Sequence, residues 1–473
     1  MAVRLFGMPN GHSLRLTRYD VGNAAYGQRP KSQKGFMKKK VAITTLGCKT
    51  NQFESAAIVE SLEKSGYSVV SFNTIADIYI INTCTVTAKS DAESRRLIRR
   101  AKKYNQDARI IVTGCYAQIS SSALEKIPDV SLVIGNNEKK RIVEFLGNQI
   151  SERVIVSDIE EDKTVSSLSL ESFAEHTRAF LQIQNGCNAF CTYCIIPYAR
   201  GRSRSVPFDE VIKGIKLYSD HGYKEVVLTG IHLGNYGFDL SPKKSIEDIL
   251  AEVEGNSLIE RIRIGSIEPN EISDRLIELL ASSKSLCPHL HIPLQSGSDS
   301  VLARMGRNYN SDLVKDIVTE LLLKVPDISI GFDVISGFPG ESDKEHNDTC
   351  SFLDEIHFAY LHVFPYSVRP GTKAADMSGH LNPEIIKARA KELRKIGENK
   401  KQNFAAKFID RRVPVLIQSR NSHGEIMALS RNYLSVKLLD DVPSLKGKER
   451  IVRIIKVDEY GACIGCLDDF CLG

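Results

Sequence analysis

The sequence lacks the long apolar runs that membrane proteins require. No run of roughly eighteen or more apolar residues occurs in the 473-residue chain, so we predict no membrane-spanning helix and no membrane partner. The first forty residues also lack the apolar core of a secretory signal, although they carry nine Lys or Arg against one acidic residue. We therefore expect a cytoplasmic protein whose cysteines remain reduced.

Beyond that basic segment the chain lacks an excess of positive charge. The net charge is +5, and the first forty residues contribute more than this, so the remainder is slightly acidic. A polyanion would therefore have to bind a local patch or the basic segment itself. The length and the 42% apolar content suit two or three domains. We predict a disordered basic extension at 1–39, in which Met37 is an alternative start, an N-terminal domain at 40–150, a linker at 151–174, a central domain at 175–405 and a small barrel at 406–473.

The tightest group of cysteines lacks the fourth ligand of a closed metal site. Cys187, Cys191 and Cys194 lie within the segment NGCNAFCTYC, and no further Cys or His nearby completes a tetrahedral zinc site. Buried structural thiols and a redox pair are the alternatives. Three thiolates leave one iron of a four-iron cube without a protein ligand. The run therefore predicts an iron-sulfur cluster with one iron open to another molecule.

Three further cysteines each follow a predicted strand. The β-branched runs KVAITTLGC, DIYIINTC and RIIVTGC end at Cys48, Cys84 and Cys115. Helical segments at 53–66 and 87–104 separate them, so strands and helices alternate as in a parallel α/β sheet. The loops after parallel strands gather at one edge of such a sheet. We therefore expect these thiols to converge on one metal centre rather than to be three unrelated core cysteines.

The central part of the chain alternates six strand-like segments with helices between residues 178 and 367, which predicts a partial barrel. One helix is expected over 245–254, with Ser245 and Asp248 at its start. Barrels of this kind carry their chemistry at the carboxyl ends of the strands. The unusual residues at those ends are Cys187, Thr229, Gly230, Ser266, Glu268 and Gln295.

The C-terminal part differs in character. From Arg412 onward, short strand-like segments separated by Gly-containing turns predict a small antiparallel barrel of nearly balanced charge. Cys463, Cys466 and Cys471 form a third set of three without a fourth ligand. We interpret them, like Cys287 and Cys350, as packing or exposed thiols rather than as a metal site.

These motifs resemble those of known enzymes. The run of three cysteines at 187–194 resembles the radical S-adenosylmethionine superfamily, in which such a run binds a [4Fe-4S] cluster whose open iron chelates the amino and carboxyl groups of the cofactor. The segments TLGCKTNQFES and INTCTVTA resemble the N-terminal domain of the methylthiotransferases, in which three cysteines hold a second [4Fe-4S] cluster. The C-terminal segment resembles the TRAM domain, a barrel that binds RNA. From residue 40 to 473 the chain resembles the methylthiotransferases throughout.

This resemblance also implies roles for single residues. Tyr193 would pack near the adenine of S-adenosylmethionine, and the Thr229–Gly230 turn would take its amino group. Ser266 or Glu268 would reach its ribose, and Gln295 is a further candidate contact.

The resemblance implies a radical reaction on tRNA. The C–H bond at carbon 2 of adenine is too inert for a side-chain base, so the cofactor must supply the reactivity. The cluster on Cys187, Cys191 and Cys194 would reduce S-adenosylmethionine to release a 5′-deoxyadenosyl radical, and the cluster on the other triplet would present sulfur methylated by a second S-adenosylmethionine. An electron donor such as flavodoxin is implied. The RNA partner would be the anticodon stem-loop, whose unpaired bases are accessible.

Several alternatives stay open at the level of the sequence. The segments TLGCKTNQ, CIIPYARGRSRS and LHVFPYSVRPGTKAADM resemble the tRNA enzymes that act on N6-threonylcarbamoyladenosine next to the anticodon. The alternatives within the family are isopentenyladenosine in tRNA and an aspartate of a ribosomal protein. An iron-sulfur electron-transfer or binding protein is the alternative of a different class, and it would close its clusters with four ligands. A single-cluster radical enzyme would hold about four irons per chain instead of about eight.

Overall fold

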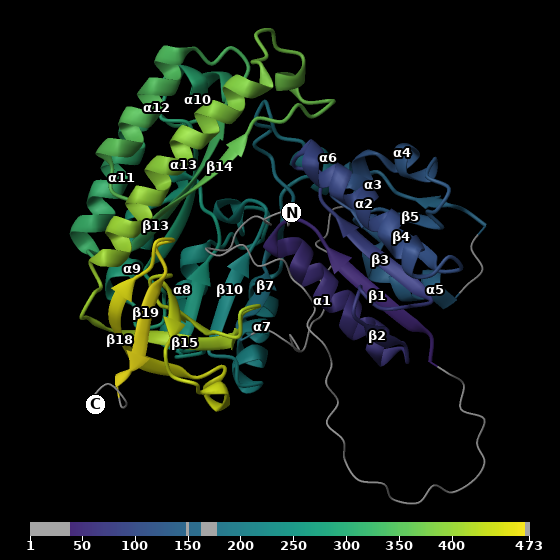
Figure 1. The fold of residues 1–473 in the computed structure, drawn as a ribbon, viewed down its shortest axis with the longest axis horizontal. Coiled ribbons are helices and arrows are strands. Elements are labelled where there is room, and N and C mark those ends of the chain that lie inside the picture. Colours follow the sequence, from purple (N-terminus) through teal and green to yellow (C-terminus); the bar gives the residue numbers. More distant parts are fainter. Residues whose placement is uncertain (1–37, 148–150, 162–176, 469–473) are drawn as a thin grey trace, which may run out of the picture. The chain divides into compact units, whose positions relative to one another are not determined.

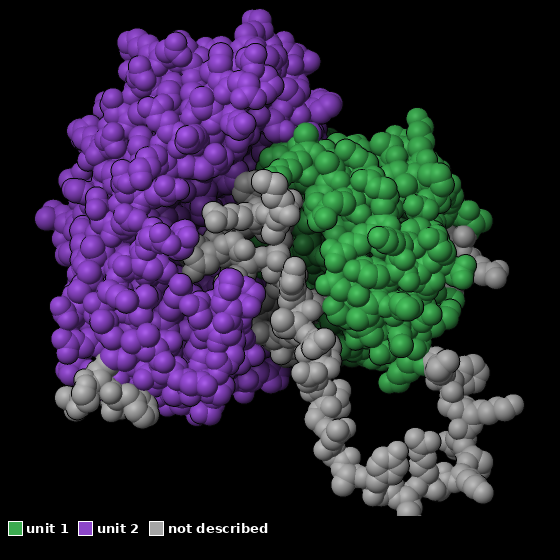
Figure 2. All heavy atoms as spheres, viewed as in Figure 1, with its two compact units in different colours: residues 1–162, 168–170 green, residues 163–167, 171–473 purple. Residues whose placement is uncertain are grey.

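The structure is a computed structural model that describes residues 38–147, 151–161 and 177–468 (Figure 1). The predicted basic extension, most of the predicted linker and Cys471 lie outside these ranges. The chain forms two compact units, residues 1–162 with 168–170 and residues 163–167 with 171–473 (Figure 2). No helix within the described ranges combines the length and apolar character needed to span a bilayer.

A six-stranded, all-parallel sheet organises the first unit, in the order β2-β1-β3-β4-β5-β6. The three strands predicted ahead of cysteines, β1 (Lys40–Thr45), β3 (Ile78–Thr83) and β4 (Arg109–Gly114), are neighbours in it. Successive residues of β3 enter two apolar cores, one on each face of the sheet, as expected for a central parallel strand. The other elements are α1 (Lys49–Lys64), β2 (Ser68–Val70), α2 (Ala88–Tyr104), α3 (Cys115–Ile119), α4 (Ser121–Glu125), β5 (Leu132–Ile134), α5 (Ile142–Gly147) and β6 (Val154–Ile155).

Six parallel strands form the predicted partial barrel in the second unit. They are arranged as two three-stranded sheets, β11-β10-β7 and β12-β13-β14, joined by parallel bridges from Ile262 to Leu286 and from Ser266 to His291. The strands are β7 (Ala179–Gln182), β10 (Glu225–Thr229), β11 (Arg261–Ile264), β12 (His289–Gln295), β13 (Ser329–Ser336) and β14 (Tyr360–Pro365). The short pair β8 (Gln184–Asn185) and β9 (Arg204–Ser205), and the helices α6 (Ile196–Arg200), α7 (Phe208–Asp220), α8 (Ile246–Gly255), α9 (Asp274–Ser282), α10 (Asp299–Met305), α11 (Ser311–Lys324), α12 (Asp343–Glu355) and α13 (Pro383–Ala406), complete this region.

Helix α8 confirms the start predicted from the sequence. The Ser245 hydroxyl accepts a hydrogen bond from the backbone N–H of Asp248 (3.3 Å), and the Asp248 carboxylate accepts one from the backbone N–H of Ser245 (2.9 Å). This reciprocal capping satisfies two N–H groups that the first helical turn leaves unpaired.

The C-terminal barrel is closed, in the order β15-β16-β17-β19-β18. The prediction of a purely antiparallel barrel is wrong in one pairing, because β17 and β19 run parallel. The reason is that β18 lies between them in the chain, so β19 returns beside β17 in the same direction. Cys463 is a free thiol buried in the barrel core, as the packing interpretation expects. Cys466 is disulfide-bonded, so the expectation of a reduced thiol is wrong at this position. The strands are β15 (Arg412–Arg420), β16 (Ile426–Ser430), which the sequence analysis missed, β17 (Ser435–Leu438), β18 (Glu449–Val457) and β19 (Cys463–Leu467).

A buried ionic cluster joins this barrel to β10 and β11. Glu225, Arg261 and Arg263 are fully buried, and the Glu225 carboxylate lies 2.6 Å from Arg261 Nη2 and 2.9 Å from Arg263 Nε. Both guanidinium groups donate to the carbonyl of Ser430, and Arg261 also pairs with Glu449 at 3.0 Å. Burial alone would raise the pKa of Glu225, but the two arginines hold it well below its usual range. The barrel is therefore fixed through charges that are all paired.

Replacing Glu225 by Gln removes the anion and leaves two buried guanidinium groups undercompensated. Breaking a buried ion pair in this way costs about 3–5 kcal/mol, so we expect a lower midpoint of chemical unfolding. We also expect faster amide hydrogen exchange in β16, which receives the arginine hydrogen bonds. Glu260→Gln, which breaks an exposed pair with Lys224, is the control and should cost less than about 1 kcal/mol. Equal exchange of β16 in the two variants would contradict this role.

Candidate active site

The carboxyl edge of the N-terminal sheet brings three cysteines together. Cys84 and Cys115 directly follow β3 and β4, and Cys48 is the residue that precedes α1. Cys84 and Cys115 are buried, whereas Cys48 is exposed. Burial, and then the charges that Cys115 and Cys48 would carry, raise the pKa of Cys84 to about 12. A Cys84 thiolate therefore needs a cationic metal centre to stabilise it.

Two buried asparagines fix the loops around these thiols. The Asn51 side-chain amide donates to the carbonyl of Thr83 at 3.0 Å, and the Asn82 amide donates to the carbonyl of Asn51 at 3.0 Å. Gly47 has a φ of +99°, and a Cβ atom there would lie 2.8 Å from Cβ of Cys84. The sequence analysis missed the asparagines, because their partners are backbone atoms that the fold brings together.

The second group of thiols lies on the loop after β7 and β8. Cys191 Sγ accepts a hydrogen bond from Arg307 Nη1 at 3.1 Å, and Cys187 Sγ lies 3.3 Å from His232 Nδ1. Burial, and then the neighbouring Cys191, raise the pKa of Cys194 to about 12. A metal centre would be needed to stabilise the Cys194 thiolate, as for Cys84 in the first group.

Neither cysteine group is spaced for a single metal ion. In the described part of the chain, two sets of three ligand atoms lie within 4.8 Å of one another, His291 with Asp333 and His362, and His346 with Cys350 and Glu392. Neither set contains a cysteine of the two groups, so at least one pair of thiols in each group is farther apart than this. A tetrahedral zinc ion with Zn–S bonds of about 2.3 Å would hold its sulfurs about 3.8 Å apart. Three thiol donors in each group fit a multi-iron cluster with one open iron.

A cavity of about 250 Å³ opens beside the second group and is lined in part by Cys191, His232, Glu268, Arg307 and Tyr309. Arg307 forms an ion pair with Glu268, and its Nε donates to the Tyr309 hydroxyl at 2.9 Å. The Cys191 thiol therefore lies in the wall of a cavity that is lined by charged and polar side chains. Such a lining suits a ligand with amino, carboxyl and hydroxyl groups.

Three of the residues predicted at strand ends differ in their position relative to this cavity. Glu268 lines the cavity, and Ser266 is exposed beside the bridge to His291. Gln295 has a φ of +67° at an irregularity in the pairing of β12 with β13. A left-handed backbone at a residue other than Gly is strained, and such strain is typical of functional positions.

The remaining residues that the sequence analysis assigned to cofactor binding are buried or partly buried. The Thr229 hydroxyl donates to the carbonyl of Leu181 at 3.2 Å, so it is engaged within the sheet. A Cβ atom at Gly230 would lie 2.9 Å from the side-chain oxygen of Gln184, so Gly230 permits close packing of two loops. Tyr193 packs partly buried against an apolar cluster that contains Met305.

Gln184 is a positioning residue that the sequence analysis missed. Its side chain is fully buried, and its amide nitrogen donates to the carbonyl of Gly186 at 2.7 Å and to the Ser203 hydroxyl at 2.9 Å. Its amide oxygen accepts from the backbone N–H groups of Ile231 and His232 at 2.9 and 2.8 Å. It therefore holds the loop that leads to Cys187 against the loop after β10. A single Gln at a strand end carries no sequence signal for this role.

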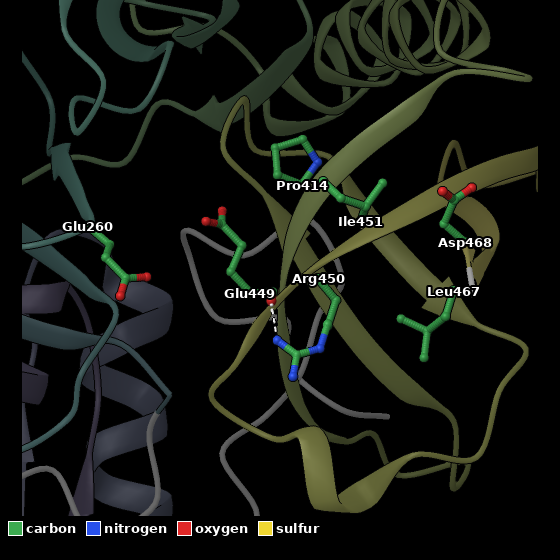
Figure 3. A pocket seen from close by; sticks show the side chains of 7 residues that line it. All are labelled: Glu260, Pro414, Glu449, Arg450, Ile451, Leu467 and Asp468. Atoms are coloured by element: carbon green, nitrogen blue, oxygen red, sulfur yellow. Dashed lines mark hydrogen bonds between the residues drawn. The ribbon is translucent and has the colours of Figure 1, made fainter. Parts of the chain in front are cut away.

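A second hollow, of about 450 Å³, is lined mostly by residues of the C-terminal barrel (Figure 3). Its lining includes the carboxylates of Glu260, Glu449 and Asp468 and one guanidinium group, that of Arg450, which donates to the carbonyl of Glu449 at 2.8 Å. An RNA backbone binds through basic side chains that neutralise its phosphates. This hollow is therefore a poor phosphate site.

Comparisons with known proteins agree with this geometry. Residues 40–135 match the uncharacterized protein family UPF0004, and residues 181–353 match the radical SAM superfamily. The threonylcarbamoyladenosine tRNA methylthiotransferase MtaB of Aquifex aeolicus is 39% identical over 401 residues, covering 84% of this chain and 96% of that protein. The protein of the same name from Bacillus subtilis is 39% identical over 426 residues, covering 88% and 94%. The tRNA-2-methylthio-N(6)-dimethylallyladenosine synthase of Thermodesulfovibrio yellowstonii is 32% identical over 429 residues, covering 89% and 97%.

The comparison with solved structures concerns the fold alone. The radical S-adenosylmethionine methyltransferase TsrM of Kitasatospora setae, solved with cobalamin and a [4Fe-4S] cluster, has a TM-score of 0.52 at 13% identity, covering 72% of this chain and 77% of that one. Fold and site together define a radical S-adenosylmethionine enzyme. The identity and coverage of its relatives show that the chain belongs to the methylthiotransferase family. The cofactors expected from the sequence, S-adenosylmethionine and two [4Fe-4S] clusters, are those of this family.

Replacing Gln184 by Leu removes five side-chain hydrogen bonds, two of them to the loop after β10, and leaves buried backbone groups unpaired, at about 1–3 kcal/mol for each unsatisfied group. We expect faster hydrogen exchange at 185–189 and 230–235, and loss of roughly half of the iron of the reconstituted protein. Gln402→Leu, which removes one exposed hydrogen bond to Glu459, is the matched control. Full iron content with unchanged exchange in Gln184→Leu would show that the loops do not depend on this side chain.

Proposed function

We propose that this chain inserts a methylthio group at carbon 2 of N6-threonylcarbamoyladenosine in tRNA, next to the anticodon. The observation that carries the proposal is the identity of its relatives. Those named for threonylcarbamoyladenosine are 35–39% identical to this chain and those named for dimethylallyladenosine 31–32%. Dimethylallyladenosine in tRNA is therefore the second candidate.

In this proposal Cys187, Cys191 and Cys194 hold the cluster that acts on S-adenosylmethionine, and the adjoining cavity binds that cofactor. When bound, this cluster would supply one electron for the reductive cleavage of S-adenosylmethionine to methionine and a 5′-deoxyadenosyl radical. The support is the cavity lining, in which Glu268 and Arg307 offer a carboxylate and a cation to the polar ends of the ligand. Tyr193, the Thr229–Gly230 turn, Ser266 and Gln295 are the further contacts that we propose for S-adenosylmethionine.

Cys48, Cys84 and Cys115 hold the second cluster. When bound, that cluster supplies an open iron at which sulfur is delivered. The support is that Cys84 and Cys115 are both buried, and that burial, with Cys115 beside it, raises the pKa of Cys84, so a metal centre is needed to stabilise the Cys84 thiolate. Asn51 and Asn82 fix the loops that carry these ligands.

The reaction needs partners that the structure does not contain. We propose the anticodon stem-loop as substrate, because its target base is unpaired and reaches a recessed site without duplex opening. The C-terminal barrel is the proposed RNA-binding module, and Arg453 and Lys456 of β18 are exposed on it. A flavodoxin-type electron donor and a cytoplasmic location complete the proposal.

Mass spectrometry of tRNA nucleosides tests the substrate. In a strain that lacks the gene we expect loss of the methylthio form of threonylcarbamoyladenosine, with the unmodified nucleoside accumulating instead. Restoring the gene should restore the product. Loss of the methylthio form of dimethylallyladenosine instead would favour the second candidate, and an unchanged tRNA profile would direct the search to a ribosomal-protein aspartate.

Variants of the cysteines test the separate roles proposed for the two clusters. Cys191→Ala should abolish release of 5′-deoxyadenosine, because the electron source for cleavage is lost. Cys84→Ala should retain that release but form no methylthio product. Cys350→Ala removes a thiol outside both groups and serves as the control. Both products are quantified by liquid chromatography and mass spectrometry, and normal 5′-deoxyadenosine release from Cys191→Ala would contradict the assignment.

A further inference from the structure

A polar cluster occupies one face of the sheet β12-β13-β14. The Asp333 carboxylate lies 3.0 Å from His291 Nε2 and 3.0 Å from His362 Nδ1, and the Tyr360 hydroxyl lies 3.1 Å from His291 Nδ1. We call His291, Asp333, Tyr360 and His362 the lumen cluster.

The strand pattern places this cluster inside the partial barrel. Along β12, Leu290, Ile292 and Leu294 are fully buried, whereas His291 and Gln295 alternate with them and stay partly accessible. In a βα-barrel the helices cover the outer face of the strands, so the alternate residues point inward. The lumen cluster therefore faces the interior and not the helical layer.

The cluster lies close to the residues proposed for S-adenosylmethionine. Ser266 is bridged directly to His291, and Gln295 pairs with Val334, the residue after Asp333. Tyr309, which lines the cavity beside Cys191, donates its hydroxyl to the carbonyl of Pro293, two residues beyond His291. A group bound at the lumen cluster would therefore lie next to the proposed cofactor site.

Packing against neighbouring residues holds the lumen cluster in place. A Cβ atom at position 331 would lie 2.0 Å from the Tyr360 ring, so Gly331 is what allows this ring to lie across β13. The Tyr360 hydroxyl also lies 2.8 Å from His289 Nε2, and the His289 ring packs on Tyr433 of the C-terminal barrel with centroids 4.2 Å apart. The positions of the polar atoms are therefore set by packing, as recognition requires.

The chemistry of the cluster is that of a hydrogen-bonding site. The side chains of His291, Asp333 and His362 retain 13%, 23% and 28% exposure, so a ligand can reach them. Burial alone would raise the pKa of Asp333, but the two histidines hold it well below its usual range. The cluster thus offers an ionised carboxylate as acceptor together with imidazole and phenol groups.

We propose that the lumen cluster binds the N6 substituent of the substrate nucleoside and selects threonylcarbamoyl over dimethylallyl. This inference rests on the proposed function and names the residues that would set its specificity. The threonylcarbamoyl group carries urea N–H and carbonyl groups, a hydroxyl and a carboxylate, whereas the dimethylallyl group has no hydrogen-bonding atom beyond N6. A ligand that displaces the hydrogen bonds within the cluster must replace them, which the threonylcarbamoyl group can do and the dimethylallyl group cannot.

Binding of matched RNAs tests this selection. Two anticodon stem-loops that differ only in the N6 substituent, threonylcarbamoyl or dimethylallyl, are titrated against the reconstituted holoenzyme by fluorescence anisotropy. We expect the wild type to prefer the threonylcarbamoyl RNA by about tenfold or more. His362→Leu and Asp333→Leu should remove most of that preference by weakening binding of the threonylcarbamoyl RNA alone, with binding of the dimethylallyl RNA changed by less than about threefold. His362→Gln, which keeps a hydrogen-bonding group, should retain part of it.

Controls separate recognition from folding and from metal binding. His357→Leu makes the same replacement at an exposed position outside the cluster and should behave as the wild type. The iron content of Asp333→Leu should equal that of the wild type, because the six cysteines proposed as iron ligands are intact. Because the same atoms are close enough to hold a metal ion, a divalent metal that the wild type contains and Asp333→Leu loses would overturn the inference.

Two failures are distinguishable. A wild type that forms no methylthio product on threonylcarbamoyl RNA overturns the proposed function. A wild type that forms this product, with variants that keep its preference or weaken both RNAs equally, overturns only the role of the lumen cluster.

Discussion

The parallel alignment of strands is the constraint on which both centres depend. Parallel strands bring the loops at their carboxyl ends to one edge, so residues far apart in the sequence meet there. In the first unit this alignment brings Cys84 and Cys115 together from neighbouring strands, with Cys48 beside them. In the second unit, β7 is short and one loop carries all three thiols, while β10, β11 and β12 supply the surrounding residues. The same rule therefore produces one group from three loops and the other from one.

Much of this arrangement follows from the sequence because its signals are local. A β-branched run followed by Cys predicts a thiol at a strand end, and Ser245 with Asp248 predicts the start of α8. Gln184 and Asn51 could not be found in that way, since their partners are backbone atoms of loops distant in the sequence. Such contacts exist only once the fold has formed.

The C-terminal barrel shows a second limit of local signals. Strand composition indicates that a segment is extended but not which neighbour it pairs with, so the parallel pairing of β17 with β19 was not predicted. The buried arginines of β11 are another case, because Arg261 and Arg263 in an isolated strand resemble surface residues. They are buried because Glu225 and the carbonyl groups of the barrel receive their hydrogen bonds. The burial of these two arginines can be explained only when their partners in the folded structure are known.

This buried ionic cluster also bears on recognition. Arg263 lies under the ring of Tyr433 at 5.0 Å, and Tyr433 in turn packs on His289 and Tyr360. The C-terminal barrel therefore packs against the residues that support the lumen cluster, and it also provides a surface of its own. Because a polar site discriminates only when its groups hold fixed positions, this packed support is a physical requirement for selectivity at the lumen cluster. The ion pairs that hold the C-terminal barrel and the polar groups inside the partial barrel thus belong to one continuous packed structure.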